Sequence, residues 1–210
     1  MLFRSVEGNT VFFTVNVGGT APLTYKWRKN GATVAGSGNS PVLILTNVQT
    51  TQAGSYTVLV TNIVSAGTLS LPASLTVLTD ADHDYIPDIY ESVTPGLNPN
   101  DASDAEKDFD LDGFSNLQEY IAGTDPNDAS SYLRIEQFGA GAGVTMLTFN
   151  AVSNRSYGVL FRNSLEAGAW QTLTNVFPRT TNRLETVIDA NPTGARRFYR
   201  LATPPPLPQP

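Results

Sequence analysis

Residues 80–91 read DADHDYIPDIYE, and residues 108–119 read DFDLDGFSNLQE. In both stretches, side chains that carry oxygen stand at positions 1, 3, 5, 9 and 12. Alternating Asp residues in a tight loop direct several carboxylates toward one centre, and Ca²⁺ takes roughly six to eight oxygen ligands. The sequence therefore predicts two calcium-binding loops, which we call loop 1 (residues 80–91) and loop 2 (residues 108–119).

Both loops offer the same kinds of ligand. Positions 1, 3, 5 and 12 give carboxylates, position 7 gives its backbone carbonyl, and position 9 acts through its side chain or a water. An all-oxygen set favours Ca²⁺ over zinc, which prefers nitrogen or sulfur, and over Mg²⁺, which disfavours crowded, flexible cages. The predicted ligands are Asp80, Asp82, Asp84, Ile86, Asp88 and Glu91 in loop 1, and Asp108, Asp110, Asp112, Phe114, Asn116 and Glu119 in loop 2.

Position 6 differs between the loops, with Tyr85 in loop 1 and Gly113 in loop 2. The calcium-loop pattern has Gly there because the backbone turns sharply. A non-Gly residue in a left-handed conformation costs on the order of 1 kcal/mol. Our hypothesis is that loop 1 binds calcium more weakly than loop 2.

Apolar residues at helical spacing follow each loop, so we expect each loop to lead into a short amphipathic helix. The pattern around the two loops also repeats, because GLNPND at residues 96–101 returns as GTDPND at residues 123–128. Gly after each helix is typical of a C-terminal cap. The predicted apolar faces are Ile86, Ile89, Tyr90 and Val93 after loop 1, and Phe114, Leu117 and Ile121, with Tyr120 beside them, after loop 2.

Residues 80–128 hold 14 of the 19 acidic residues and one of the 13 basic residues, a formal charge of −13. Such a segment repels itself and stays solvated unless something positive binds it. A plain acidic linker is the alternative, but the ordered spacing of the acids favours a calcium module. This segment resembles bacterial thrombospondin type 3-like calcium repeats, which are EF-hand-like. The resemblance implies calcium-dependent rigidification and an extracellular or cell-surface setting, and dockerins are the main alternative family.

Residues 6–78 show short alternating apolar runs that are typical of half-buried strands. Asn30-Gly31 is a turn signal, and residues 42–45 are a candidate strand. Around Tyr56, the chain resembles an immunoglobulin-like domain, with Tyr56 in the tyrosine-corner position. Val58 and Val15 stand where the bridging cysteines would be, so packing around Trp27 must replace the disulfide. The residues that carry the resemblance are Ala53, Gly54, Tyr56, Val58, Val60 and Asn62.

Residues 131–203 are β-like again, and their RRFYRL ending at 196–201 resembles small β domains that follow such repeats in large secreted bacterial proteins. Gly139–Gly143 reads as a flexible hairpin connection. Trp170, Tyr157 and Phe161 are expected in the core, with a carbohydrate-stacking face as the alternative. The candidate strands are 132–137, 144–150, 156–162, 170–176, 184–188 and 197–202.

The fold class is therefore mainly β. We expect an N-terminally truncated immunoglobulin-like sandwich (1–78), a short α-containing calcium-loop module (79–130), a small β-sandwich-type domain (131–203) and a proline-rich tail (204–210). The absence of cysteine excludes disulfides and thiolate sites, and no apolar run is long enough to span a membrane. Residues 1–5 lack the apolar core of a signal peptide. Because the first domain begins part-way in, we expect the C-terminal fragment of a longer exported protein.

No catalytic constellation stands out. His83 is the single histidine and lies at a variable loop position, and no nucleophile elbow or nucleotide loop is present. The acidic balance argues against nucleic acid as a partner. We expect a monomeric, non-enzymatic linker in which Ca²⁺ rigidifies the junction of two β domains. An adhesion or carbohydrate-binding module, with a protein or glycan surface as partner, and an appendage of a secreted enzyme are the alternatives.

Overall fold

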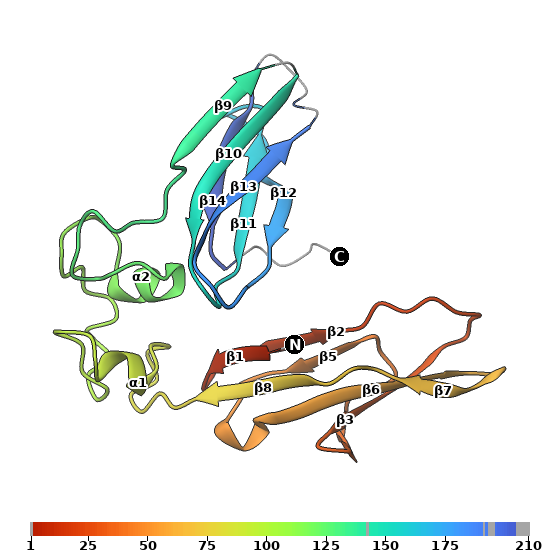
Figure 1. The fold of residues 1–210 in the computed structure, drawn as a ribbon. Helices are drawn as coiled ribbons and strands as arrows, with labels where there is room; N and C mark the ends of the chain where they lie inside the picture. The colour runs from red at the N-terminus through yellow and green to blue at the C-terminus, as the bar shows by residue number, and fades with distance from the viewer. Residues whose placement is uncertain (1, 142, 191, 193–195, 205–210) are drawn as a thin grey trace. The chain divides into compact units, whose positions relative to one another are not determined.

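The computed structural model describes residues 2–141, 143–190, 192 and 196–204. The chain divides into two compact units, Met1–Ala105 (unit 1) and Glu106–Pro210 (unit 2) (Figure 1). Loop 1 lies in unit 1 and loop 2 lies in unit 2. The predicted calcium-loop segment 79–130 therefore spans the division between the units. Apart from Pro204, the predicted tail lies outside the described residues.

Unit 1 is a sandwich of two sheets. One sheet has the order β1-β8-β6-β3-β4, with β7 also paired to β6, and the other pairs β2 with β5 (Figure 1). β1 runs parallel to β8, while the other pairs are antiparallel. The strands are β1 Leu2–Val6, β2 Val11–Thr14, β3 Thr24–Lys29, β4 Ala32–Thr33, β5 Val42–Leu45, β6 Gly54–Asn62, β7 Ser65–Leu69 and β8 Ala73–Leu78.

Aromatic packing fills the core of unit 1. Trp27 and Tyr56 are both buried, and the Tyr56 hydroxyl donates a 2.7 Å hydrogen bond to the Gln52 carbonyl, as the tyrosine corner requires. Val58 is fully buried in the same cluster. These contacts confirm the predicted immunoglobulin-like sandwich.

Phe13, rather than Val15, is the buried β2 residue against Trp27. The ring centroids of Phe13 lie 6.3 Å from Trp27 and 4.7 Å from Tyr56, the latter in a stacked arrangement. Val15 is only partly buried against this cluster. A large aromatic side chain thus occupies the space between the sheets, and it supplies apolar area where a disulfide is impossible.

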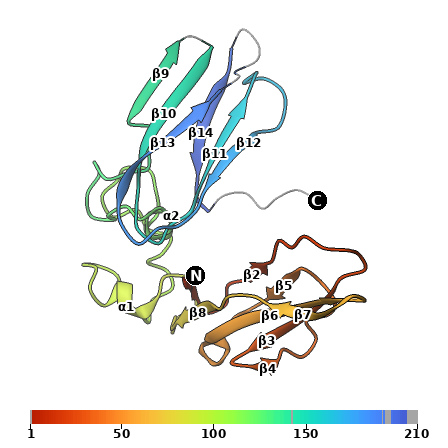
Figure 2. The same cartoon turned by 45° about the vertical axis from the view of Figure 1, so that its right-hand side comes forward.

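Unit 2 contains two three-stranded antiparallel sheets, β13-β10-β9 and β12-β11-β14, which Figure 2 shows face to face. Leu147 and Phe149 of β10 pack with Tyr157 and Val159 of β11 in a core where all four are fully buried. The predicted small β-sandwich-type domain is therefore present. The strands are β9 Gln137–Gly141, β10 Val144–Ala151, β11 Tyr157–Arg162, β12 Gln171–Val176, β13 Arg183–Asp189 and β14 Phe198–Ala202.

The first predicted strand of this domain was misplaced. Residues 132–136 are not in a strand, whereas β9 continues through Gly141 into the stretch predicted as a flexible connection. Pairing explains the difference, because Gly139 stands opposite Met146 and Gly141 opposite Val144 in the β10 ladder. A neighbouring strand has overridden the local preference of the glycines.

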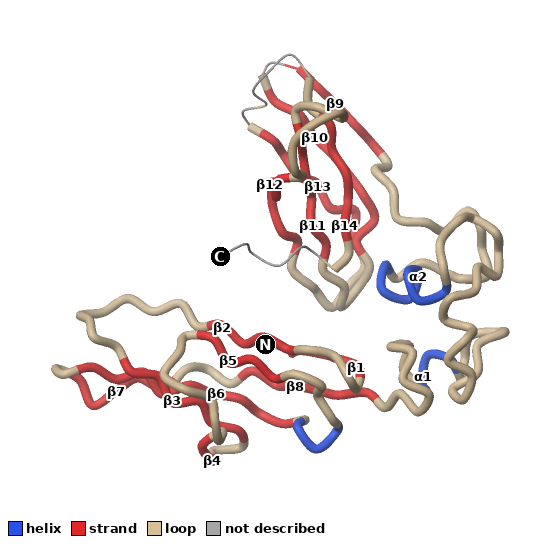
Figure 3. The backbone as a smooth tube through the Cα atoms, turned by 180° about the vertical axis from the view of Figure 1, so that it is seen from behind, coloured by secondary structure: helices blue, strands red, loops and turns tan. Residues whose placement is uncertain are grey.

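The helices are short and begin inside the loops: α1 spans Asp88–Glu91, the end of loop 1, and α2 spans Asn116–Ala122 (Figure 3). The predicted apolar face of the first is wrong, because Ile89 and Val93 are 67% and 77% exposed. A single turn cannot present a face of that length. In α2, Tyr120 and Ala122 are the buried apolar residues, while Phe114, outside the helix, is 44% exposed. Among the described residues, no helix has the length and apolar character of a membrane span.

Candidate metal centre

Asp80 organises the backbone of loop 1. Its Oδ1 accepts hydrogen bonds from the amides of His83 at 2.9 Å and Asp84 at 3.3 Å, and its Oδ2 accepts from Tyr85 at 2.9 Å. Asp84 Oδ1 accepts from the amide of Ile86 at 2.7 Å. The first and third Asp residues thus fold the loop around their own carboxylates, as Asx-type turns do.

Loop 2 repeats this arrangement. Asp108 Oδ1 accepts from the amide of Leu111 at 2.7 Å, and its Oδ2 accepts from Gly113 at 2.9 Å. Asp112 Oδ1 accepts from the amide of Phe114 at 2.8 Å. The amides at positions 4, 6 and 7 therefore make the same bonds in two segments that share little sequence beyond their oxygen-bearing residues. The amide at position 5 differs, since it donates to Asp80 in loop 1 and to Asp110 in loop 2.

The backbone angles agree as well. Position 4 has positive φ in both loops, 68° at His83 and 65° at Leu111. Position 6 also has positive φ, 75° at Tyr85 and 97° at Gly113. The sharp left-handed turn predicted at position 6 is therefore present in both loops, and Tyr85 adopts it without the freedom of glycine.

The alternating Asp residues converge as the spacing predicted. Within each of two trios, one oxygen from each carboxylate lies within 4.8 Å of the others: Asp80, Asp82 and Asp84 in loop 1, and Asp108, Asp110 and Asp112 in loop 2. Burial, followed by repulsion from Asp82 and Asp80, raises the pKa of Asp84 to about 6. Like charges at such distances destabilise one another unless a proton or a cation joins them.

Glu91 and Glu119, at position 12, are almost fully enclosed, each 1% exposed. Burial and the charge of Asp84 raise the pKa of Glu91 to about 8, and burial with the charge of Asp110 raises the pKa of Glu119 to about 7. Within the described chain, neither oxygen of Glu91 has a hydrogen-bond partner, and Glu119 Oε2 also lacks one. A buried carboxylate without partners is costly.

The unsatisfied carboxylate oxygens gather at the two loops. Among the described residues, buried carboxylate oxygens without a hydrogen-bond partner occur on both oxygens of Asp82 and on one oxygen each of Asp84, Asp110 and Asp112, besides the two Glu residues. Several converging carboxylate oxygens are the ligand set that Ca²⁺ prefers. The residues present therefore fit a bound calcium ion in each loop.

The remaining predicted ligands lie around these trios. Asp88 Oδ1 accepts a 2.8 Å hydrogen bond from the amide of Ala81, so one of its oxygens braces the start of loop 1. Asn116 is fully buried as the first residue of α2. Ile86 is fully buried, whereas Phe114 is partly exposed, and the predicted ligand of each is its backbone carbonyl. Those carbonyl roles stay predictions.

Asp104 is a candidate that the sequence analysis missed. It lies between the loops, is 1% exposed, and has an oxygen within 4.8 Å of oxygens of Asp84 and Glu91. The twelve-residue loop pattern ends at Glu91, so it does not include Asp104, which lies thirteen residues later. The sequence repeats Asp-Ala-Ser at residues 101–103 and 128–130, but the approach of Asp104 to loop 1 depends on the intervening turn.

His83 is exposed, which agrees with its interpretation as a solvent-facing loop residue. The aromatic residues of the alternative carbohydrate face do not form a bare platform. Tyr157 is fully buried, Trp170 lies against the guanidinium groups of Arg162 and Arg200 at 4.6 and 4.5 Å, and Arg197 covers Phe161 at 4.1 Å. The expectation that these rings mainly pack within the domain is confirmed for Tyr157.

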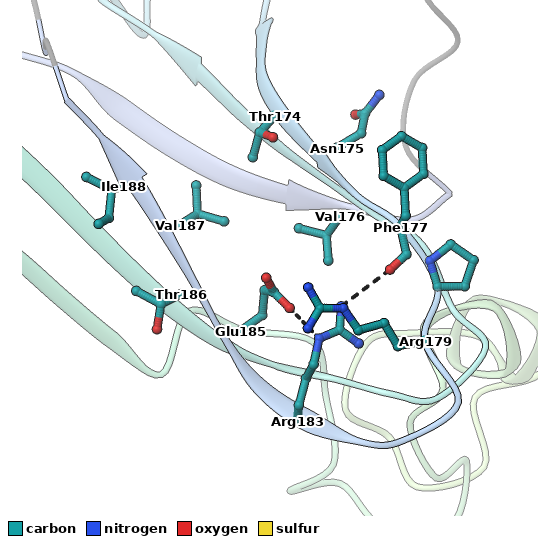
Figure 4. A pocket seen from close by; sticks show the side chains of 11 residues that line it. Thr174, Asn175, Val176, Phe177, Arg179, Arg183, Glu185, Thr186, Val187 and Ile188 are labelled. Carbon is teal, nitrogen blue, oxygen red and sulfur yellow. Dashed lines mark hydrogen bonds and ion pairs between the residues drawn. The ribbon is translucent and has the colours of Figure 1, made fainter. Parts of the chain in front are cut away.

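Unit 2 has a hollow of about 390 Å³ beside β12 and β13 (Figure 4). Arg183 is paired with Glu185 there and donates a 3.4 Å hydrogen bond to the carbonyl of Phe177. Its charge is already balanced within the unit. The carboxylate loops are therefore the stronger candidate site.

Residues 3–62 match the family model of the immunoglobulin domain. No curated protein matches the chain. Among solved structures, the immunoglobulin domains 1–5 of Sidekick-1 are 26% identical, with 35% of this chain and 15% of that chain covered and a TM-score of 0.33. Domains 3–5 of the extracellular part of Drosophila OTK are 21% identical, with 36% of this chain and 28% of that chain covered and a TM-score of 0.31.

The titin fragment I67–I69 is 19% identical, with 37% of this chain and 30% of that chain covered and a TM-score of 0.34. The chain thus spans less than a third of each of these three structures. The family match does not reach residues 80–128, whose resemblance to thrombospondin type 3-like repeats stays a prediction. Residues 3–62 match this family, contain the tyrosine corner and lie in the two-sheet sandwich of β1–β8, so this part of the chain is an immunoglobulin-like domain.

Proposed function

We propose that loops 1 and 2 each bind one Ca²⁺ ion, and that the chain is a calcium-dependent structural segment of an extracellular or cell-surface multidomain protein. The observation that carries the proposal is the pair Glu91 and Glu119. Each is buried at position 12 of a loop whose three Asp residues converge, and each has at least one oxygen without a hydrogen-bond partner in the described chain.

The ion supplies the positive charge that these carboxylates lack. Asp80 and Asp108 hold the loops in shape, while the other carboxylates provide the unsatisfied oxygens. Neutralising the acidic segment favours the folded chain, since a ligand that binds only the folded state stabilises it by about 2.7 kcal/mol per site at 100 times its dissociation constant. Extracellular calcium modules work with dissociation constants of about 10⁻⁴–10⁻³ M, which suits a setting outside the cell.

Loop 2 is attached to the β domain of unit 2 by several contacts. Gly123, with φ of 82°, caps α2, and a side chain added there would meet Val152. Arg155 covers the ring of Tyr120 at 4.3 Å. An ion held by Glu119 would thus stiffen the connection between loop 2 and the strands, which supports a structural role.

Thermal unfolding of the full chain in excess Ca²⁺ and in chelator tests the proposal. We expect Ca²⁺ to raise the unfolding temperature, and Glu91→Gln and Glu119→Gln each to remove part of the rise. Glu136→Gln, a carboxylate of unit 2 outside the loops, is the matched control and should keep the full rise. Equal unfolding temperatures of the unchanged protein in millimolar Ca²⁺ and in chelator would contradict the proposal.

The alternatives stay open to a direct test. Adhesion or carbohydrate binding has no comparable built site among the described residues, because guanidinium groups lie over Trp170 and Phe161. Retention of the chain on an insoluble polysaccharide, lost in a Trp170→Ala variant, would favour that function. Its role as an appendage of a secreted enzyme is a prediction about sequence beyond this chain.

A further inference from the structure

Asp104 belongs to neither loop, yet its carboxylate lies with loop 1. It is the thirteenth residue after Glu91 and is 1% exposed. One oxygen from each of Asp84, Glu91 and Asp104 lies within 4.8 Å of the other two, and all three residues are buried. The carboxylate trio Asp80, Asp82 and Asp84 shares Asp84 with this second trio, so both belong to one acidic centre.

The neighbouring carboxylates indicate that this centre is built for a ligand. Glu91 is 1% exposed, and within the described chain neither of its oxygens has a hydrogen-bond partner. Asp84 Oδ2 is also buried without a partner there. The buried, unpartnered oxygens of Glu91 and Asp84 need a cation to offset their repulsion and lost hydration.

The turn that carries Asp104 is present twice in the chain. In the first copy, the amide of Asn98 donates to Asp104 Oδ2 at 2.8 Å. In the second copy, 27 residues later, the amide of Asp125 donates to Ser131 Oγ at 3.0 Å. Asp104 and Ser131 therefore hold the same turn, but a serine hydroxyl offers no carboxylate oxygen to an ion.

A second hydrogen bond, made by the aspartate three residues before Asp104 and Ser131, is also the same in both turns. Asp101 Oδ1 accepts from the amide of Ser103 at 3.2 Å, and Asp128 Oδ1 accepts from the amide of Ser130 at 3.0 Å. Since the turns match, the structural task of position 104 is met by serine in the second copy. The turn therefore does not require a carboxylate at Asp104.

We propose that Asp104 is an additional ligand of the loop 1 cation, supplied by the segment between the loops. The inference rests on the proposed calcium function and names a ligand outside the twelve-residue pattern. It widens the difference between the two sites, because Asp104 becomes a sixth carboxylate at loop 1, whereas loop 2 has four. The other five at loop 1 are Asp80, Asp82, Asp84, Asp88 and Glu91.

The position of Asp104 along the chain gives this ligand a consequence. The two compact units divide between Ala105 and Glu106, and loop 2 begins at Asp108. An ion bound by Asp104 and another bound by Asp108 therefore leave three residues, 105–107, between anchored points. Calcium at loop 1 fixes the chain up to the boundary of unit 1.

Calcium binding to the full chain in a Glu119→Gln background isolates loop 1. We expect Asp104→Asn to weaken binding at loop 1 by at least about tenfold, because a charged ligand is lost. Asp104→Ser, which copies the second turn, should weaken it similarly while keeping the hydrogen bond from Asn98. Asp101→Asn removes the same charge three residues away and is the matched control, with an expected change below about threefold.

Each result has a defined meaning. Equal effects of Asp104→Asn and Asp101→Asn, or no effect of either, would overturn the ligand assignment while leaving calcium binding intact. Absence of binding by the unchanged chain would instead overturn the proposed function, and this inference with it. Circular dichroism of each variant in chelator separates a lost ligand from a lost fold, because a ligand variant keeps the spectrum of the unchanged chain.

Trypsin offers a second measurement, since Lys107 is the one basic residue of segment 80–128 and its side chain is exposed. We expect Ca²⁺ to slow cleavage after Lys107 by at least about tenfold, since cleavage needs local opening of the backbone. Asp104→Asn in the otherwise unchanged chain should restore much of the cleavage, and Asp101→Asn should not. Full calcium protection of Asp104→Asn would contradict the role of Asp104.

Discussion

The hydroxyl of Tyr157, buried in the core of unit 2, donates a 2.9 Å hydrogen bond to the carbonyl oxygen of Ala122, the last residue of α2. The same hydroxyl accepts a 3.0 Å hydrogen bond from the amide of Val152. Glu119 lies on the same helix, one turn before Ala122. The Tyr157 side chain thus links β11 to α2, the helix that carries the predicted calcium ligand Glu119.

Replacing Tyr157 with Phe should lower the free energy of unfolding of unit 2 by about 1–3 kcal/mol, because the Ala122 carbonyl and the Val152 amide lose a buried partner. Calcium affinity at loop 2 should fall with it, and affinity at loop 1 should stay. Denaturant unfolding followed by Trp170 fluorescence in a Trp27→Phe background reports unit 2. Tyr132→Phe, which changes an exposed tyrosine of the same unit, is the control. Identical unfolding of the two variants would refute this coupling.

Gly123→Ala should destabilise unit 2 through two effects. Its φ of 82° favours glycine, and an added Cβ would lie 2.8 Å from Val152 Cβ. Gly168→Ala is the matched control, since φ there is 96° and no atom lies within 4 Å of an added Cβ. In denaturant unfolding, we expect Gly168→Ala to lower the free energy of unfolding by about 1 kcal/mol and Gly123→Ala to lower it clearly more. Equal losses would mean that the contact with Val152 relaxes freely.

Stability in chelator should fall as pH rises from about 4.5 to about 8. The pKa of Glu91 is raised from 4.5 to about 8 and that of Glu119 to about 7, mainly by burial. Within this window, the folded chain binds more protons than the unfolded chain, so the free energy of unfolding decreases with rising pH. Unfolding temperatures in chelator at about pH 5.5 and pH 8 measure this, and excess Ca²⁺ should flatten the dependence at the higher pH. A rise in stability with pH in chelator would contradict the burial of these carboxylates.

Tyr85→Gly should strengthen calcium binding at loop 1, or stabilise unit 1, by about 1 kcal/mol, because glycine adopts the left-handed turn without strain. Tyr85→Asn should give part of this gain, since Asn also tolerates that conformation. Calcium titration of both variants in a Glu119→Gln background, together with their unfolding temperatures, makes the comparison. If neither affinity nor stability changed, the turn at Tyr85 would carry no cost, and the hypothesis of a weaker loop 1 would lose its basis.

Features set by residues close in sequence were predictable. Residues 42–45 were predicted as a strand and form β5, and the Asn30-Gly31 turn joins β3 to β4 with positive φ at both residues. The conformation of the two loops was also predictable, because Asp80 and Asp108 each accept hydrogen bonds from amides no more than five residues away. In these places, local hydrogen bonds and the alternation of apolar and polar residues determine the structure.

Features set by distant partners were not predictable. Gly139 and Gly141 belong to β9 because β10 pairs with them, although glycine favours loops. Ile89 and Val93 have helical spacing, but α1 ends at Glu91, before a face can form. Asp104 reaches loop 1 through a turn whose course the loop pattern does not contain. Each error arose where pairing or chain reversal, rather than local preference, decided the outcome.

Calorimetric titration of the full chain with Ca²⁺ tests the central claim most directly. The account predicts two binding sites with dissociation constants at or below about 10⁻³ M, one lost in Glu91→Gln and the other in Glu119→Gln. Absence of any binding heat and of any thermal stabilisation at millimolar Ca²⁺ would contradict it, and residues 80–128 would then be an acidic connector between two β domains.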